Sequence, residues 1–171
     1  MEDLEEGITF LRQALALLPL GHPGRPVSLN NLAGAVHTRF DQLGGMEDLE
    51  EAITFHCQAL ALLPHGHPDH PQFLNNLAGA VVTRFRQLGG MVDLEEAITY
   101  HRKALALHPH GYPNLSSSLS KLATAVFIRF EQLGGMVDLE EAITRLSKVR
   151  SRSGPGTFCG PWTRTQGIFY F

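Results

Sequence analysis

The feature that most constrains this chain is a unit of 45 residues that recurs in register. The segment Met-x-Asp-Leu-Glu-Glu-x-Ile-Thr begins at four positions, which are Met1, Met46, Met91 and Met136. A second segment, Arg-Phe-x-Gln-Leu-Gly-Gly, closes each full unit and begins at Arg39, Arg84 and Arg129. Self-similarity at a fixed period of this size predicts a solenoid or a propeller, whose units pack mainly on their neighbours.

The residues within one unit predict two helices. In the second unit, apolar residues fall on one face at the 3.6-residue spacing of a helix, namely Leu49, Ala52, Ile53, Ala59, Leu60 and Leu63. We expect Pro64 to stop this helix and Gly89 to end the next one, because glycine readily adopts the left-handed cap conformation. Asp48, followed three residues later by Glu51, predicts a capping box at the helix start.

The repeat therefore predicts an all-α fold, an α-α superhelix of about seven antiparallel helices. The expected helices span residues 2–18, 26–43, 47–63, 71–88, 92–108, 115–133 and 137–149. We expect residues 1–149 to form one helical repeat array of three 45-residue units and a partial fourth. Residues 150–171 are a tail without the repeat.

The tail breaks the register of the repeat. Arg150 stands where the three full units have leucine, and glycine, proline and aromatic residues follow without periodicity. One interpretation is a C-terminal cap over the last helix pair, which solenoids need for solubility. The hypothesis that we favour is translation past a splice site or through a frameshift, which would leave a disordered or mistranslated segment.

The overall composition excludes several classes of function. Fourteen Lys and Arg against 17 Asp and Glu give a net charge of −3, which argues against a basic surface for nucleic acid. No apolar run is long enough to span a membrane, and the acidic start does not match a targeting signal. Two cysteines, Cys57 and Cys159, do not make a disulfide framework. We therefore expect a cytoplasmic protein that binds neither nucleic acid nor membrane.

The sequence gives little support for catalysis, so we predict neither an enzyme nor a cofactor or metal site. The common nucleotide-binding, hydrolase and metalloprotease motifs are absent from the sequence. Three histidines share one predicted loop and have side chains suited to metals, namely His65, His67 and His70. The matching loop of the first unit keeps a single histidine, His22, which weakens that interpretation. His56 and His101 take a helical position that is Leu11 in the first unit, which favours the edge of the core.

These units resemble tetratricopeptide (TPR) repeats. The spacing of the family's second helix and terminal proline is matched by Ala97, Ala104, Leu105, Leu107 and Pro109. Asn76-Leu77-Ala78 matches the family's first helix. The usual TPR period is about 34 residues, and the extra length here falls at helix ends and in loops. The Leu-Asn-Asn-Leu-Ala and Gly-His-Pro signatures are most similar to kinesin-light-chain-type repeats and to long fungal TPR arrays, some of which carry CHAT or nucleotide-binding domains.

This resemblance implies that the first helix of each pair lines a concave groove that binds a peptide. By alignment with the family, Asn31, Asn76 and Lys121 share a groove-facing position, and Thr38 and Thr83 face the same way. An asparagine amide both donates and accepts hydrogen bonds, so it suits a peptide backbone. The resemblance thus implies a protein-interaction scaffold that binds a protein or peptide partner.

Several alternatives remain open at this point. Arg39 and Arg84 either line the groove or pair with the glutamates near the helix starts. One asparagine of each Asn-Asn pair either binds the partner or stabilises the helix start or an adjacent loop. The alternative function is that of a fragment of a larger CHAT-protease or nucleotide-binding signalling protein. A third hypothesis is self-association through unpaired terminal helices.

Overall fold

The computed structural model describes residues 2–108 and 114–134, together with residues 140, 143, 144 and 147. These residues include six helices, namely α1 (Glu2–Leu17), α2 (Arg25–Leu43), α3 (Met46–Leu62), α4 (His70–Leu88), α5 (Met91–Leu107) and α6 (Leu115–Leu133). Each helix end lies within one residue of its prediction, so these six predictions are confirmed. The helix predicted at 137–149 falls mostly outside the described residues, and the tail at 150–171 falls wholly outside them.

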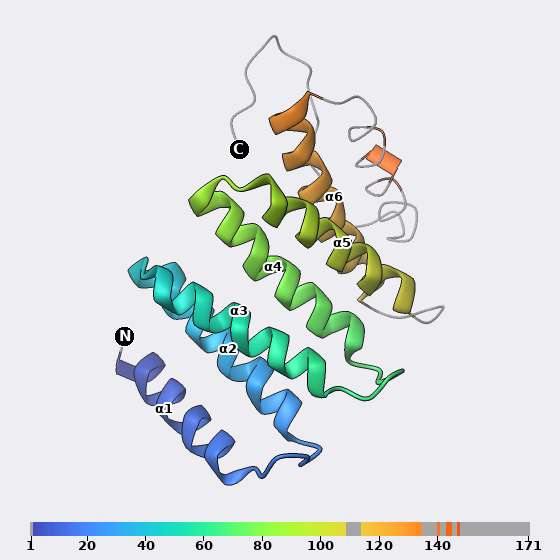
Figure 1. The fold of residues 1–171 in the computed structure, drawn as a ribbon. Coiled ribbons are helices and arrows are strands. Elements are labelled where there is room, and N and C mark those ends of the chain that lie inside the picture. Colours follow the sequence, from blue (N-terminus) through green and yellow to red (C-terminus); the bar gives the residue numbers. More distant parts are fainter. Residues whose placement is uncertain (1, 109–113, 135–139, 141–142, 145–146, 148–171) are drawn as a thin grey trace, which may run out of the picture.

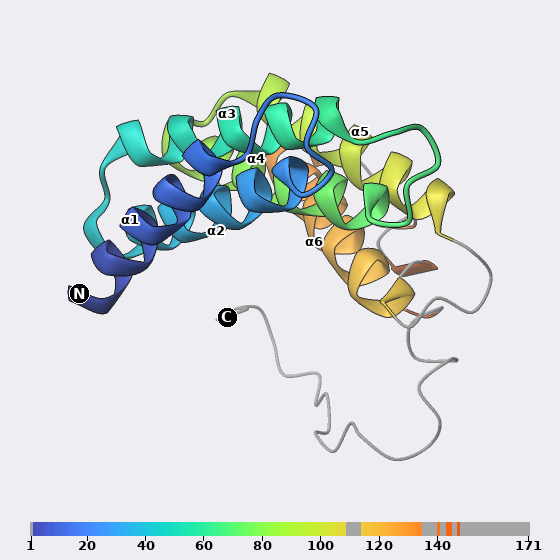
Figure 2. The ribbon, with the colours of Figure 1, turned by 90° about the horizontal axis from the view of Figure 1, so that it is seen from below.

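The helices form a two-layered arc (Figures 1 and 2). The closest pairs are α2 with α3 and α4 with α5, and each pair is an antiparallel hairpin. Figure 2 shows α3 and α5 on the outer side of the arc, and α2, α4 and α6 towards its hollow side. The inner helices also contact one another in the order α2, α4, α6. The predicted α-α superhelix is thus confirmed. None of the described helices is long and apolar enough to cross a membrane.

A glycine pair makes each tight turn from an inner helix to the outer helix that follows. Gly44 and Gly89 have φ angles of 77° and 73°, in the left-handed region that disfavours residues with a Cβ atom. Their N–H groups donate to the carbonyl groups of Phe40 and Phe85 at 2.7 Å, which closes the last helical turn. The repeated Gly-Gly therefore sets where each hairpin reverses.

Small residues at matched positions let the paired helices approach closely. The alanines that the outer helices bury completely are Ala52, Ala59, Ala97 and Ala104. Around Ala52, the side chains of Leu32 and Val36 from α2 meet Ile8 from α1. One cluster thus joins helices of two successive units, which is how a solenoid builds a continuous core.

The capping role predicted for Asp48 with Glu51 is wrong. Helix α3 begins at Met46, after an extended Gly45, and no side chain caps its N-terminus. Asp48 lies inside the first turn, where its carboxylate accepts two hydrogen bonds from Arg39, at 2.6 and 2.7 Å. An acidic residue there still favours the positive end of the helix dipole. The Asp48 carboxylate binds Arg39 across the tight turn and does not cap the helix.

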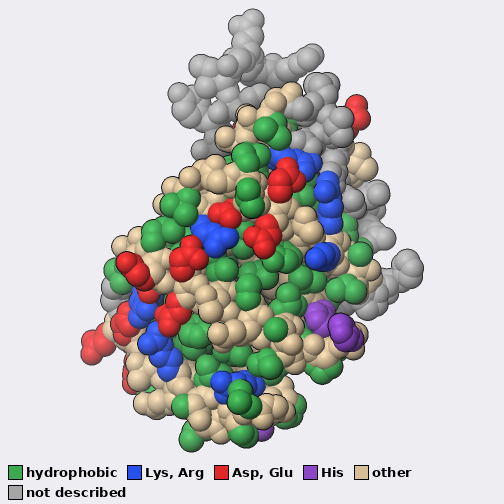
Figure 3. Space-filling model, viewed as in Figure 1, with side chains coloured by type: hydrophobic (Ala, Val, Ile, Leu, Met, Phe, Trp, Pro, Cys, Tyr) green, Lys and Arg blue, Asp and Glu red, His purple; other side chains and the backbone are tan. Residues whose placement is uncertain are grey.

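Arg39 and Arg84 also bind the outer helix that precedes their own helix in the chain. Arg39 on α2 donates to Glu5 on α1 at 3.1 Å. Arg84 on α4 repeats the pattern, with Asp93 on α5 at 2.8 Å and Glu50 on α3 at 3.2 Å. These carboxylates raise the pKa of both guanidinium groups above the ordinary arginine value. Each arginine therefore ties three helices together, and Figure 3 shows side chains of both charges next to one another on the outer face.

Arg84→Ala should lower the free energy of unfolding by about 1–2 kcal/mol, because it leaves two carboxylates without their shared cation. Arg86→Ala is the matched control, since Arg86 is exposed two positions further along the same helix. Urea unfolding of both variants measures the difference, which should shrink in molar salt. Equal midpoints for the two variants would contradict the role assigned to Arg84.

Candidate functional site

Helices α2, α4 and α6 lie towards the hollow side of the arc (Figure 2), and each has a stripe of residues at matched repeat positions that are exposed or half-buried. In α2 the exposed stripe is Val27, Asn31, Gly34, Thr38 and Asp41. The same repeat positions in α4 are Gln72, Asn76, Gly79, Thr83 and Arg86. Val82, next to Thr83, is buried and is not part of this stripe. In α6 they are Ser117, Lys121, Thr124, Ile128 and Glu131. Because the other faces of α2 and α4 pack against neighbouring helices, these stripes form the surface of the inner face.

The predicted asparagine and lysine row lies on this surface. Asn31 and Lys121 are exposed, and Asn76 is half-buried between them in the repeat. The Asn76 amide donates to Oδ1 of Asn30 at 3.1 Å and accepts from Nε2 of Gln72 at 2.9 Å. The structure thus brings the three residues into one row, with Asn76 already held by protein partners.

The two predicted threonines lie on the same stripes. Thr38 is exposed and donates its hydroxyl proton to the carbonyl of Gly34 at 2.9 Å. Thr83 is half-buried and donates likewise to the carbonyl of Gly79 at 3.1 Å. Its oxygen also lies 3.3 Å from Nε2 of His37, which links α2 to α4. Both hydroxyl protons are therefore used within their own helices.

The sequence left open whether the two predicted arginines line the groove or pair with acidic residues, and the structure shows the pairing. Arg39 and Arg84 pair with acidic residues, and their side chains are only 18% and 21% exposed. Each forms a two-bond contact with an aspartate at the start of the next helix and a further contact with a glutamate on the preceding helix. In this arrangement they hold helices together, and their guanidinium groups face carboxylates of the chain itself.

A polar pair that we did not foresee joins α2 to α3, and a matching pair joins α4 to α5. Nδ1 of His56 donates to Oδ1 of Asn30 at 3.1 Å, and Nδ1 of His101 donates to Oδ1 of Asn75 at 2.8 Å. The two histidines are 3% and 2% exposed, deeper than the edge of the core expected from Leu11. Burial lowers the pKa of both from 6.5 to about 4, so they are neutral at pH 7.

The second of these pairs extends into the next unit. The Asn75 amide donates to the hydroxyl of Ser118 on α6 at 2.7 Å, and that hydroxyl lies 2.6 Å from Nε2 of His108. The available signal in the sequence was a histidine that follows the first asparagine of each pair by 26 residues. That first asparagine faces the core, while the second, at Asn31 and Asn76, faces the inner surface.

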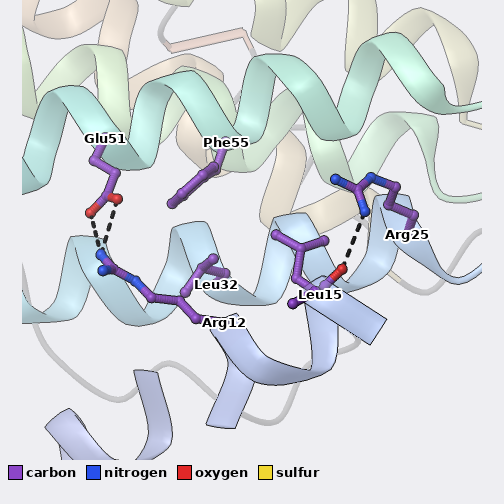
Figure 4. A pocket seen from close by; sticks show the side chains of 7 residues that line it. Arg12, Leu15, Arg25, Leu32, Glu51 and Phe55 are labelled. Atoms are coloured by element: carbon purple, nitrogen blue, oxygen red, sulfur yellow. Dashed lines mark hydrogen bonds and ion pairs between the residues drawn. The ribbon is translucent and has the colours of Figure 1, made fainter. Parts of the chain in front are cut away.

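The outer face carries one hollow of about 450 Å³ between α1 and α3 (Figure 4). Leu15, Leu32 and Phe55 form its apolar lining. At one end Arg12 forms a two-bond ion pair with Glu51, at 2.9 and 3.0 Å. At the other end Arg25 donates to the carbonyl of Leu15 at 3.2 Å. The polar groups drawn around this hollow therefore already have partners in the chain.

The described residues offer little for metal or thiol chemistry. Within them, no three His, Cys, Asp or Glu side chains come together as a metal would require. Cys57 is exposed, at a repeat position that holds Arg12 and Arg102 in the other units. Partial burial of the thiol and the nearby Glu96 raise its pKa, which disfavours the reactive thiolate.

The buried histidines should make stability depend on pH. Because the folded pKa of His101 is about 4 and the unfolded value is 6.5, the unfolded chain binds a proton first as pH falls below 6.5. Each such histidine then removes about 1.4 kcal/mol of stability per pH unit down to about pH 4. His101→Gln keeps a donor for Asn75 without this titration, so urea unfolding between pH 7 and 5 should show a shallower loss. An unchanged slope would contradict the burial of a neutral His101.

Three solved structures are similar to this chain over most of its length. A variant crystal structure of the nearly identical TPR-like repeats of a Podosopora anserina protein, described as a kinesin light chain, is 21% identical with a TM-score of 0.65. It covers 86% of this chain and 66% of its own. The structure of the same repeats without the substitution is 20% identical with a TM-score of 0.60, and covers 90% of this chain and 70% of its own.

BtubC (BKLC) from P. vanneervenii is 19% identical with a TM-score of 0.66, and the match covers 99% of this chain and 64% of that protein. The chain thus spans about two thirds of the length of these structures. No family model and no curated protein matches the sequence. The match in helix order and arrangement shows that the chain has the fold of a TPR-like repeat protein.

Proposed function

We propose that this chain is a protein-interaction scaffold that holds an extended peptide segment on its inner face. The TPR-like fold supports an interaction scaffold in general. The peptide site is assigned to the stripes of α2, α4 and α6 that face the hollow side of the arc. Asn31, Asn76 and Lys121 are proposed to bind the peptide, with Thr38 and Thr83 beside them.

The observation that carries this proposal is a pair of glycines in the middle of the inner stripes. Gly34 and Gly79 lie inside α2 and α4, where each costs about 0.5–1 kcal/mol relative to alanine. A Cβ atom added at either position would meet nothing within 4 Å. Packing therefore does not require glycine there, whereas the close approach of a bound backbone would.

The groups around these glycines suit a peptide backbone of varied sequence. Asn31 is exposed one turn from Gly34, and its amide offers both a donor and an acceptor. Lys121 supplies a cation at the same repeat position on α6. The ion pairs of Arg39 and Arg84 contribute by holding the helices, and hence the row, in place. Affinity then comes from a surface that is ordered before the peptide binds.

Peptides selected from a random display library on the purified chain test the proposal. The double variant Asn31→Ala with Lys121→Ala should raise the Kd of a selected peptide by about tenfold or more, because it removes amide and ammonium contacts. Gln58→Ala with Lys103→Ala is the matched control on the outer helices, where both residues are exposed. Fluorescence anisotropy measures the affinity of the selected peptide for the unmodified chain and for each double variant. Failure to select any saturable peptide, or equal losses in both double variants, would refute the groove.

The glycines give a test in which stability and binding move in opposite directions. Gly34→Ala with Gly79→Ala should raise the free energy of unfolding by about 0.5–1 kcal/mol per site. The same variant should weaken peptide binding by about fivefold or more, because two methyl groups would hold the backbone away. Gly7→Ala on α1, also with open space around its Cβ, should stabilise without affecting affinity. Unchanged peptide affinity in the inner-face variant would remove this support.

A further inference from the structure

One repeat position near the C-terminal ends of the inner helices carries charges that alternate in sign. The closing segment Arg-Phe-x-Gln-Leu-Gly-Gly is identical in the three units except at x, which is Asp41, Arg86 and Glu131. All three residues are exposed, and they end the stripes of α2, α4 and α6 described above. The inner face therefore presents a negative, a positive and a negative charge in succession along the arc.

Contacts within the chain do not explain this alternation. Arg86 and Glu131 form no ion pair or side-chain hydrogen bond with the described residues. Asp41 lies 3.9 Å from Nε2 of His37 and pairs with no arginine or lysine among those residues. Asp41 and Glu131 also stand in the last turns of their helices, where a carboxylate is disfavoured by the negative end of the helix dipole. Of the three charges, only that of Arg86 suits its helix end.

A polar contact between α2 and α4 places the first two charges side by side. Nε2 of His37 lies 3.3 Å from Oγ1 of Thr83, and each of these residues stands about one turn before its helix's charge. Helices α4 and α6 also contact each other. Since packed helices lie about 8–10 Å apart, opposite charges follow one another at about that spacing across the inner face.

A peptide in the polyproline II conformation matches this spacing. With three residues per turn and a rise of about 3.1 Å, it places side chains three positions apart on one side, about 9 Å from each other. A β-strand would turn the same two side chains to opposite sides. The charged row lies seven positions beyond Gly34 and Gly79, which is two helical turns or about 10 Å. Long side chains such as arginine and glutamate would span this distance from a backbone that lies over the glycines.

We propose that the inner face selects a polyproline II segment with basic, acidic and basic side chains at positions i, i+3 and i+6. The two basic side chains pair with Asp41 and Glu131, and the acidic side chain pairs with Arg86. This inference rests on the proposed peptide site and adds the order and spacing of charges to it. Exposed ion pairs are individually weak, so they set which peptide binds best and leave the basic affinity to the amides and glycines.

Two synthetic peptides of equal composition and net charge test the order of charges on the full chain. One contains Arg-Ala-Pro-Glu-Ala-Pro-Arg, in which the prolines favour the polyproline II conformation, and the other contains Glu-Ala-Pro-Arg-Ala-Pro-Arg. Fluorescence anisotropy should show that the first peptide binds about fivefold or more tightly, with a difference that shrinks in molar salt. Equal affinities, or no saturable binding of the first peptide, would overturn the proposal.

A charge exchange separates this pairing from general attraction. Replacing the central glutamate of the first peptide with arginine should strengthen binding if net charge alone mattered, because the chain has a net charge of −3. We expect binding to weaken by about fivefold instead, and Arg86→Glu in the chain to restore it. Lys103→Glu on the outer helix α5 makes the same change in charge at an exposed position, and should not restore it. Tighter binding of the all-basic peptide to the unmodified chain would contradict the pairing with Arg86.

The peptides selected from the random library distinguish this inference from the proposed function. Selected peptides that depend on Asn31 and Lys121, but show no preference for this order of charges and no response to Arg86→Glu, would leave the peptide site standing and overturn the inference. Failure to select any saturable peptide would overturn both. Enrichment of the basic, acidic, basic order, with a basic central residue selected on the Arg86→Glu chain, is the result that we expect.

Discussion

The arc depends on the contacts between an arginine near the end of an inner helix and the carboxylates of the two neighbouring outer helices. Arg84 binds Asp93 on α5 across the tight turn and Glu50 on α3, so one planar cation joins α4 to both neighbouring outer helices. Arg39 does the same one unit earlier with Asp48 and Glu5. A guanidinium suits this task because its several donors lie in one rigid plane. The repeat can therefore keep its geometry although each contact alone is half-exposed.

The asparagine–histidine pairs also hold inner helices to outer helices within the repeat. Asn75 turns into the core and binds His101, while its neighbour Asn76 lies towards the inner surface. The side chains of Asn75 and His101 thus hold helices together and are not available to a partner. The inner stripes keep the Asn31 amide, the Lys121 ammonium group and the Gly34 backbone exposed, and these are the groups that the proposed peptide site would use.

Helix ends were predictable because local signals agreed with one another. Apolar spacing indicates the length of each helix, Pro64 the end of α3 and Gly89 the end of α4, and the repeat presents such signals several times. The role of Asp48 was not predictable, since an aspartate in the first turn has the same pattern whether it caps a helix or binds an arginine. The burial of His101 also depends on a partner 26 residues away, and a periodic pattern does not show which of two adjacent asparagines faces it. The row of Asn31 and Lys121 followed from the alignment of units, and its binding role stays a prediction.

Repetition determines how the inner surface extends along the arc. The inner stripes occupy the same repeat positions of α2, α4 and α6, so the length of the surface that they form grows with the number of units. Stability adds up in the same way, because in a solenoid it is a sum over units and the interfaces between them. The contacts of Arg84 with α3 and α5 are therefore the kind of interface that each further unit of this sequence would add.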